Sequence, residues 1–572
     1  MFNPKGPYIY NSKARMKGCE ILLLTVSLLA IGIQLIYIQV FRHNEFVDKT
    51  ERTIYDYLDE DRLRGQIYDV NGNALAESVR THSCGISRRY VQDAQKTKDF
   101  LVETLGISRK ELEKKWKGKP NFFFVTKKIK PDIYMQLATV LRTPLGQGLE
   151  VTPEYERIHP YGTSAIDLLG EANSKNLGLS GLELMFNDEL SQDISKRRAK
   201  RARRGELIYD KSLKEKKSVG SLHLTIDMLA QNYAETALEK AVKTYEPEHG
   251  LILVQEPQTG RILAAASYPR KDGQSLPFQF TYEPGSTFKT IAIVSALDAG
   301  AVSIHDSIDM SGRSWEIARG VTVKDKQHKK DALTIPEIMA LSSNIGAGKI
   351  ALELGAKNLF YYIKAFGFGT KTDINFNGES KGYVPPYNKW TKVDTATKGY
   401  GYGISLTPIQ LIGAYSAIAN GGWLMQPHLI DYIEYSDGHI EKKAKTQRIR
   451  KVIKPETVKT MKKVLEHVVL EGSGQKAQIP GYSVAGKTGT AEKLDKEGGY
   501  AKRRHVVSFC GFTPVEDPRF TILIVLDNPA KYTFGGTAAA PVFKEVAEGL
   551  LAIEGVAPDK PEELIAKSAK SK

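Results

Sequence analysis

Ser286 and Lys289 are three residues apart and could form an activated nucleophile. Pro284-Gly285 precedes them, and the apolar spacing from Thr287 to Leu297 predicts a helix with Ser286 in its first turn. Residues three apart share one face of a helix, so the Lys289 amine can reach the Ser286 hydroxyl. A serine hydroxyl attacks only after a base takes its proton, and a lysine with a lowered pKa can be that base. Free amide groups at the helix N-terminus would stabilise an oxyanion.

Two further motifs follow in the order expected of a serine acyl-transfer site. Ser342-Ser343-Asn344 is an S-x-N triplet at a break after the helical segment 333–340, and Lys487-Thr488-Gly489-Thr490 contains a K-T-G triplet on a predicted strand. This ordered set is typical of β-lactamases and penicillin-binding proteins. Ser473-Gly474-Gln475-Lys476 repeats S-x-x-K, but no S-x-N separates it from the K-T-G, so we expect no catalysis there. Ser174-Lys175-Asn176 precedes any S-x-x-K and fails the same test.

The chain resembles the class B penicillin-binding proteins, the monofunctional peptidoglycan transpeptidases, along nearly its whole length. One departure is that Pro277-Phe278-Gln279-Phe280 replaces the Asn-Arg found there in many members. The resemblance extends to six segments outside the three motifs: 64–69, 157–162, 178–183, 406–411, 419–422 and 535–543.

The resemblance implies a role in acylation for each of five residues. Ser286 would attack the penultimate D-Ala of a pentapeptide stem and release the terminal D-Ala, with Lys289 as base. Ser342 would relay a proton to the leaving amine, and Asn344 would bind the substrate amide and hold Lys289. Lys487 would supply positive charge near the relay. The amine of a second stem would then attack the acyl-enzyme and close the cross-link.

The K-T-G segment would also bind the substrate. The resemblance implies that Thr488, Gly489 and Thr490 form this binding strand, the two threonines holding the terminal carboxylate. Backbone amides of Ser286 and Thr490 would form the oxyanion hole. β-Lactams mimic D-Ala-D-Ala and would acylate Ser286. We expect no cofactor and no metal, because the eleven histidines show no metal-ligand spacing.

Alternative functions remain open from the sequence. The same serine chemistry serves a β-lactamase or a D-Ala-D-Ala carboxypeptidase, although the large segment before Ser286 disfavours both. A non-catalytic scaffold would not need all three motifs. Within the family, Ser342-Ser343-Asn344 and the segment 399–405 favour a septal, cell-division role over elongation. The resemblance implies partners among divisome proteins, including a membrane glycosyltransferase.

The apolar run 21–40 predicts one membrane-spanning helix, because twenty residues span about 30 Å. Lys5, Lys13, Arg15 and Lys17 precede it, which predicts a cytoplasmic N-terminus and a catalytic part outside the bacterial inner membrane. The run ends without a small-residue cleavage site, so we expect an anchor and not a signal peptide.

The net charge of +15 does not indicate a nucleic-acid partner. Residues 196–217 hold eleven Lys and Arg and three Asp and Glu, so one stretch supplies over half of the excess. Such a run is more often a solvated surface or a site facing an acidic polymer than a DNA reader. The sequence does not reveal its role.

The fold class expected is α+β, with strands, then helices, then strands and a closing helix. We expect a cytoplasmic N-terminus at 1–20, the membrane helix at 21–40 and a mixed α/β pedestal domain at 41–217, of the penicillin-binding protein dimerisation type. A transpeptidase domain at 218–554 would follow, a β-sheet flanked by helices as in serine β-lactamases, and then a disordered tail at 555–572. Strands are predicted at 484–491, 505–513 and 520–527, and helices at 228–244, 335–354, 408–420 and 540–552. Asn71-Gly72 predicts a hairpin turn.

Overall fold

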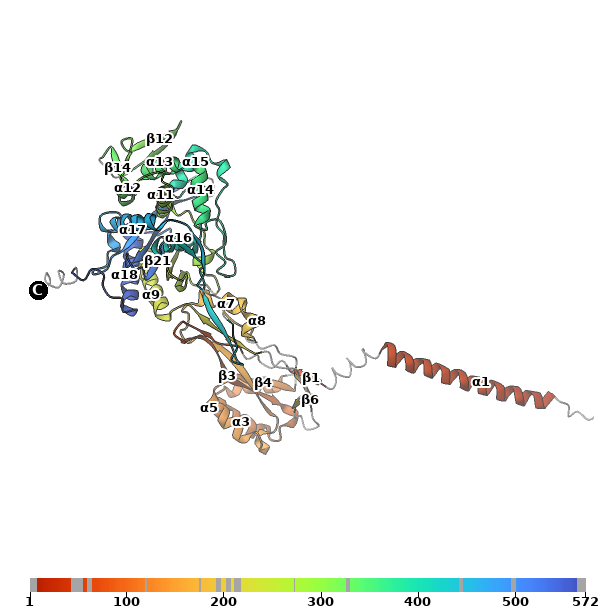
Figure 1. Cartoon of the computed structure of the whole chain (residues 1–572). Coiled ribbons are helices and arrows are strands. Elements are labelled where there is room, and N and C mark those ends of the chain that lie inside the picture. Colours follow the sequence, from red (N-terminus) through yellow and green to blue (C-terminus); the bar gives the residue numbers. More distant parts are fainter. Residues whose placement is uncertain are drawn as a thin grey trace, which may run out of the picture. The chain divides into compact units, whose positions relative to one another are not determined.

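A computed structural model covers the whole chain (Figure 1). The chain divides into two units, one formed by residues 1–61 and 193–217 and the other by residues 62–192 and 218–572. The residues that the structure describes are 8–42, 55–58, 64–118, 121–173, 176–191, 197–201, 207–209, 218–271, 273–325, 330–441, 446–494 and 500–562.

The first unit contains the apolar helix. Helix α1 (Tyr8–Ile36) continues into a short π-helix, η1 (Tyr37–Phe41). Within them, the 25 residues Met16–Val40 have a mean hydropathy of 2.5 in their most apolar window and bury none of it. Among the described residues this is the one helix long and apolar enough to cross a membrane, and it includes the predicted run 21–40.

The same unit contains a small antiparallel sheet in the order β1-β6-β7, built from Tyr55–Leu58, Arg197–Arg201 and Leu207–Tyr209. Part of the backbone of the basic stretch 196–217 is therefore strand. The other residues of this stretch lie outside the described part of the chain.

The second unit is built on a five-stranded antiparallel sheet in the order β10-β9-β21-β20-β19. The central strand β21 (Phe520–Asp527) is buried along its whole length, as expected for a strand covered on both faces. The other strands are β9 (His249–Gln255), β10 (Ile262–Tyr268), β19 (Ala485–Leu494) and β20 (Tyr500–Thr513). Strand β19, which carries the K-T-G triplet, is at one edge of the sheet.

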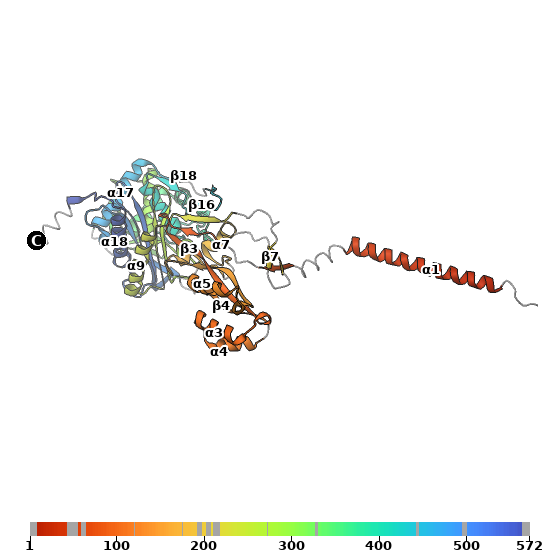
Figure 2. The same ribbon diagram turned by 90° about the horizontal axis from the view of Figure 1, so that it is seen from below.

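Helices cover both faces of this sheet. Helices α9 (Met228–Tyr245) and α18 (Gly535–Ile553) lie side by side on one face and share a core with β9, β20 and β21 (Figures 1 and 2). The other face packs against α11 (Lys289–Asp298), α16 (Pro408–Ala419) and α17 (Pro455–Leu470). This layered α+β arrangement is the expected fold class.

A helical lobe continues from α11. It contains α12 (Ile335–Leu341), α13 (Asn344–Leu354), α14 (Ala356–Ala365) and α15 (Lys392–Gly399), together with the short strand pairs β11 (Ser307–Asp309) with β14 (Ala332–Thr334) and β12 (Ser314–Ala318) with β13 (Val321–Lys324). The helical pattern predicted at 335–354 is therefore two helices, separated at Ser342 and Ser343.

A second, seven-stranded sheet has the order β17-β16-β8-β2-β3-β4, and β5 also pairs with β3. The Asn71-Gly72 turn joins β2 to β3 as predicted, with Gly72 at a φ of 81°. Strands from both sides of the expected boundary at residue 217 share this sheet. Their bounds are β2 (Ile67–Tyr68), β3 (Ala74–Ser87), β4 (Phe122–Ile129), β5 (Leu149–Ile158), β8 (Gly220–Leu224), β16 (Ile430–Tyr435) and β17 (Ile440–Glu441).

Short helices complete this part of the chain. Helices α3 (Ala94–Leu105), α4 (Arg109–Lys117) and α5 (Pro131–Val140) enclose a separate small core with β3 and β4. The remaining short elements of the second unit, which include the strand pair β15 and β18, are η2 (Arg88–Tyr90), η3 (Pro144–Gly146), α6 (Ile166–Leu169), α7 (Gly181–Met185), α8 (Asn187–Leu190), α10 (Leu276–Gln279), η5 (Tyr387–Lys389), β15 (Trp423–Met425), β18 (Arg448–Lys451) and η6 (Gln475–Ala477).

A buried ion cluster joins the ends of the 62–192 segment. The guanidinium of Arg64 donates to the carboxylate of Glu183, and both side chains are fully buried. Arg157 donates to the same carboxylate at 2.7 Å and to the carbonyl of Gly65 at 2.7 Å. Three segments singled out by the resemblance, 64–69, 157–162 and 178–183, thus meet at one carboxylate.

The tail departs from expectation. We expected disorder from residue 555, but Asp559 accepts hydrogen bonds from the amide and the hydroxyl of Ser483, and Lys560 pairs with Glu466 at 2.8 Å. These contacts hold residues 556–560 against the turn before β19, so the expected start of the tail is too early. Residues 563–572 lie outside the described part of the chain.

Candidate active site

Ser286 lies in a single turn of 3-10 helix, η4 (Gly285–Phe288), directly before α11. In a 3-10 helix residues three apart eclipse, so Ser286 and Lys289 face the same side, although the α-helix begins only at Lys289. Gly285 has a φ of 53° and packs against β19: a Cβ atom there would lie 3.0 Å from the carbonyl oxygen of Thr490. The glycine therefore lets the nucleophile turn approach the K-T-G strand.

Lys289 is fully buried, and its ammonium position is fixed by Ser342. Its Nζ atom lies 2.5 Å from the carbonyl oxygen of Ser342 and 3.2 Å from the Ser342 Oγ. Burial holds the pKa of Lys289 well below its ordinary value, the charge of Lys487 lowers it further, and the carboxylate of Asp325 raises it. A lysine amine that loses its proton readily can serve as a base.

Ser342 joins the two helices of the S-x-N segment in a left-handed backbone conformation. Its φ is 57° and its ψ is 42°, and it ends α12. Asp325 holds the following turn: its carboxylate accepts from the amide of Asn344 at 2.7 Å and from the hydroxyl of Ser343. The Ser343 hydroxyl in turn accepts from the amide of Gly346 and caps α13. Because this turn is pinned on both sides, the Ser342 hydroxyl is held beside Lys289.

Lys487 is the second fully buried lysine. Burial lowers its pKa to about 7. Its Nζ atom lies 3.4 Å from the Ser473 hydroxyl and 3.4 Å from the Thr488 hydroxyl, and these two hydroxyls are 2.8 Å apart. Ser473, where we expected no catalysis, therefore belongs to the surroundings of the K-T-G triplet.

The backbone of β19 faces the cleft along its free edge. The amide of Glu492 donates to the Tyr402 hydroxyl at 3.1 Å, outside the sheet. Amides two residues apart on a strand point the same way, so the Thr490 amide also faces outward, as an oxyanion donor must. A Cβ atom on Gly489 would lie 2.3 Å from the Ser508 Oγ, which explains why glycine stands there.

A cleft of about 760 Å³ brings most of these groups together. Ser286, Ser342, Asn344, Thr488 and Thr490 line it, whereas Lys289, Lys487 and Gly489 are buried behind its wall. Among the described residues, Lys289 is hydrogen-bonded to Ser342 and not to the Ser286 hydroxyl. Asn176, from the rejected S-x-N copy, lies elsewhere, with its carbonyl on Arg64.

Among the cleft residues that sequence reasoning missed, Asp325 and Ser473 hold the motif residues in place. Ser473 carried a signal, the repeated S-x-x-K, but its contacts run to Lys487 and Thr488 and not to a second catalytic pair. Asp325 carried none, because its role depends on a contact with residues some twenty positions later in the chain.

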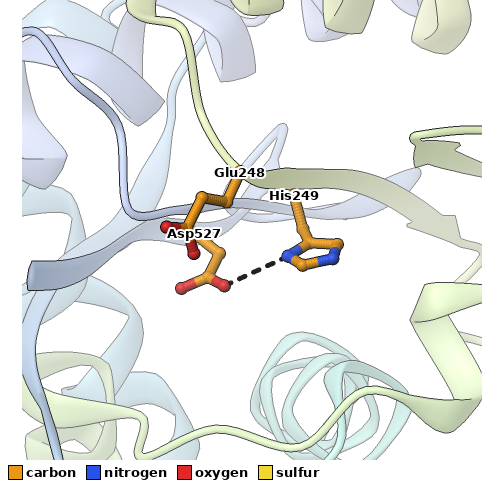
Figure 3. Close-up of side chains that lie close together, drawn as sticks. All are labelled: Glu248, His249 and Asp527. Carbon is orange, nitrogen blue, oxygen red and sulfur yellow. Dashed lines mark hydrogen bonds and ion pairs between the residues drawn. The ribbon is translucent and has the colours of Figure 1, made fainter. Parts of the chain in front are cut away.

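A cluster of Glu248, His249 and Asp527 has the composition of a metal site, and their side chains converge in Figure 3. It lies outside the cleft lining. Lys493 pairs with Asp527 at 2.8 Å, Arg504 pairs with Glu248 at 3.0 Å, and His249 lies 3.3 Å from Asp527. Protein cations thus already balance both carboxylates, and the cluster is an ion-pair network around the buried Asp527.

A serine at a helix start, a buried lysine with a lowered pKa and an outward strand amide together define a serine acyl-transfer enzyme. The penicillin binding protein transpeptidase domain family matches residues 250–548, and the penicillin-binding protein dimerisation domain family matches residues 60–224. The chain belongs to the class B penicillin-binding proteins, the peptidoglycan D,D-transpeptidases.

Its relatives share nearly the whole chain. Stage V sporulation protein D of Bacillus subtilis is 33% identical over 528 residues, which cover 87% of this chain and 79% of that protein. The peptidoglycan D,D-transpeptidase FtsI of Escherichia coli is 28% identical over 568 residues, 96% of this chain and 92% of that protein. Penicillin binding protein 3 of Mycobacterium tuberculosis, solved with aztreonam, has the same fold: the TM-score is 0.68 at 24% identity, over 88% of this chain and 98% of that one.

Proposed function

We propose that this chain cross-links peptidoglycan stem peptides through an acyl-enzyme on Ser286, in septal cell-wall synthesis. The observation that carries the proposal is the placement of Lys289 between the Ser286 turn and the Ser342 hydroxyl, behind the wall of a cleft bounded by the K-T-G strand. The names of relatives such as FtsI support the enzymatic and septal parts.

In the proposed acylation, Lys289 removes the proton of Ser286 as the hydroxyl attacks the penultimate D-Ala carbonyl. The amides of Ser286 and Thr490 hold the oxyanion. Ser342, within 3.2 Å of Lys289, passes a proton to the leaving D-Ala amine. Lys289, which then carries the Ser286 proton, donates it to the Ser342 Oγ atom, so both residues end the step in their starting forms.

In the same proposal, Thr488 and Thr490 bind the terminal carboxylate of the donor stem, and Lys487 supplies positive charge near the Ser342 relay. The buried Lys487 gains a counter-charge when that carboxylate arrives, which favours its protonated form. Asn344, at the first position of α13, faces the cleft and binds the donor amide. A second stem's amine then replaces D-Ala and completes the cross-link.

The proposal includes the cellular setting. The helix within Met16–Val40 would anchor the chain in the inner membrane, with the N-terminus in the cytoplasm and the catalytic part outside. A membrane glycosyltransferase and other divisome proteins would be its partners. Depletion should then give filamentous cells, whereas round or swollen cells would indicate elongation.

The first test is labelling of the detergent-solubilised full chain with a fluorescent penicillin. We expect a long-lived adduct on the wild type and none on Ser286→Ala, with Ser303→Ala, an exposed serine outside the cleft, as the matched control. Lys289→Ala should slow acylation by about 100- to 10,000-fold, because it removes the base. Labelling of Ser286→Ala would refute the assignment. Rapid release of hydrolysed penicillin by the wild type would instead indicate a β-lactamase.

A further inference from the structure

A second cavity, of about 120 Å³, lies beside helix α16. Its lining comes from the segments 366–373, 409–413, 424–427 and 449–450, which belong to α16, to the strand pair β15 and β18, and to the loop after α14. We call it the α16 cavity. Among the described residues none lines both this cavity and the catalytic cleft, so the reaction proposed above does not account for it.

The floor of the α16 cavity is apolar. Phe366, Ile409, Leu424 and Met425 line it and are buried. Sites for small molecules are lined mainly by such side chains, with a few polar groups that fix the orientation of the ligand. The floor therefore suits the carbon part of a ligand.

Gly413 keeps the space above this floor open. It is in the interior of α16, where glycine is less favourable than alanine. Outside the helix's own backbone, a Cβ atom there would meet only the Cδ1 atom of Leu424, at 3.9 Å. No close approach of another element thus requires this glycine, and its consequence is room in the cavity.

The loop at the rim is fixed by side chains of the same region. Gln410 donates to the carbonyl of Thr370 at 2.6 Å, and Gln426 donates to the carbonyl of Thr372 at 2.5 Å. The buried carboxylate of Glu379 accepts from the amide of Thr372 at 2.5 Å and from its hydroxyl at 2.7 Å. The wall of the cavity is therefore formed before any ligand arrives, as in most small-molecule sites.

The rim carries charged side chains that are available to a ligand. Lys371, Asp373 and Arg450 line the cavity and are exposed, and none of the three has a side-chain hydrogen bond or ion pair within the described part of the chain. Burial lowers the pKa of Lys364, and the charges of Arg450 and Lys381 lower it further, which shows that cations gather here. Two cations and one carboxylate line the rim, so it attracts an anion.

The size of the cavity limits the ligand. An apolar cavity of about 150 Å³ holds benzene, so the α16 cavity accepts a group of about four or five carbons. We propose that the α16 cavity binds a carboxylate joined to a short, branched carbon group. The carbon group lies against Gly413 and Leu424, and the carboxylate accepts from Lys371 and Arg450. This inference goes beyond the proposed function and does not depend on it.

The test compares isovalerate with its neutral amide, isovaleramide. Binding of each to the solubilised full chain is titrated by saturation-transfer NMR, after Ser286 has been acylated with penicillin and the excess removed, so that the catalytic cleft is blocked. The wild type should bind isovalerate about three- to ten-fold more tightly at low salt, because two exposed ion pairs form. Salt should reduce this preference. N-acetylvaline then distinguishes the sources: tighter binding than isovalerate would indicate the C-terminus of a peptide, and weaker binding a free acid.

Two kinds of variant separate the floor from the rim. Gly413→Val fills the space and should abolish binding of both compounds. Gly413→Ala should weaken both while raising the unfolding temperature, because alanine favours a helix interior. Changing both rim cations, Lys371→Gln with Arg450→Gln, should remove the preference for the acid and leave the affinity for the amide. Lys357→Gln is the matched control, since Lys357 is exposed on α14 outside the lining, and it should keep both affinities.

Equal affinities of the wild type for the acid and the amide would overturn the site. Undiminished binding by a folded Gly413→Val or Gly413→Ala variant would overturn it as well. Failure of penicillin to acylate Ser286 would instead contradict the proposed function, and the binding of isovalerate can still be measured without that step.

Discussion

At the scale of residues, the buried Lys289 is affected by the charge of a second buried lysine, Lys487. Lys289 and Lys487 are both fully buried, and the charge of Lys487 is one cause of the lowered pKa of Lys289. The free amine of Lys289 is the form that can act as base. The acylation rate should therefore rise with pH through the lowered pKa of Lys289.

Lys487→Gln should move this rising limb to higher pH. Loss of the neighbouring positive charge makes Lys289 hold its proton more tightly, so its pKa increases. The measurement is the acylation rate constant for one penicillin across the pH range, for both proteins. A limb at the same pH in the variant would mean that Lys487 does not act on Lys289 through charge.

Ser473→Ala should slow acylation by about five-fold, which corresponds to one hydrogen bond of about 1 kcal/mol. The Ser473 hydroxyl holds both Lys487 and the Thr488 hydroxyl, and its loss frees the carboxylate-binding end of the cleft. Ser473→Thr keeps a hydroxyl and should keep the rate. Equal rates for the alanine and threonine variants would remove Ser473 from the site.

The sequence predicted which motif residues come together better than it predicted the residues that hold them in place. Order and spacing of three motifs were enough to bring Ser286, Ser342 and Thr490 to one cleft. Asp325 and Ser473 were not predicted, because a hydrogen bond between distant segments leaves no local pattern of apolar spacing or turn residues. Ser473 matched the S-x-x-K pattern, but its contacts in the fold are with Lys487 and Thr488 and do not form a second catalytic pair.

At the scale of elements, the break between α12 and α13 gives the site its geometry. A continuous helix would place Ser342 on a regular turn, whereas the left-handed conformation at Ser342 directs its carbonyl and hydroxyl to Lys289. The break was visible in the sequence. Asp325, whose carboxylate holds this break, follows strand β13, and its role was not visible in the sequence.

Asp325→Ala should destabilise the fold by about 1–2 kcal/mol and slow acylation. The carboxylate satisfies two amides at the start of α13, at 2.7 and 3.3 Å, in the manner of a helix cap. Thermal unfolding and penicillin labelling of the purified chain would measure both effects. Asp331→Ala, an exposed carboxylate in the same connection, should change neither. An Asp325 variant with normal acylation would show that the turn keeps its shape unaided.

Helix and strand positions followed from periodicity where elements are long. The predicted strand 520–527 and helix 228–244 agree with β21 and α9 to within one residue. The ordered conformation of residues 556–560 was not predicted, because their composition is that of a disordered tail. Single contacts, such as that of Asp559 with Ser483, hold them in place. Composition reports average burial and not such individual contacts.

At the scale of the whole molecule, a buried carboxylate ties the second unit together. The carboxylate of Glu183 accepts from Arg64, which lies just before β2, and from Arg157 on β5. Glu183→Gln should destabilise the fold by about 3–5 kcal/mol, since it leaves two buried guanidinium groups without their counter-charge. Thermal unfolding measures the loss, with the exposed Glu171→Gln as control. A change under 1 kcal/mol would show that water or backbone carbonyls can replace the carboxylate.

The seven-stranded sheet is completed by distant parts of the chain. Strand β8 ends at Leu224, and its neighbour β16 begins only at Ile430, some 200 residues later. At a synthesis rate of about 5–20 residues per second, about 10–40 s pass between the synthesis of β8 and the synthesis of β16. During that time one edge of the sheet presents unpaired backbone groups, which can pair with other chains. While the chain is being made, this edge therefore stays open to such pairing until β16 covers it.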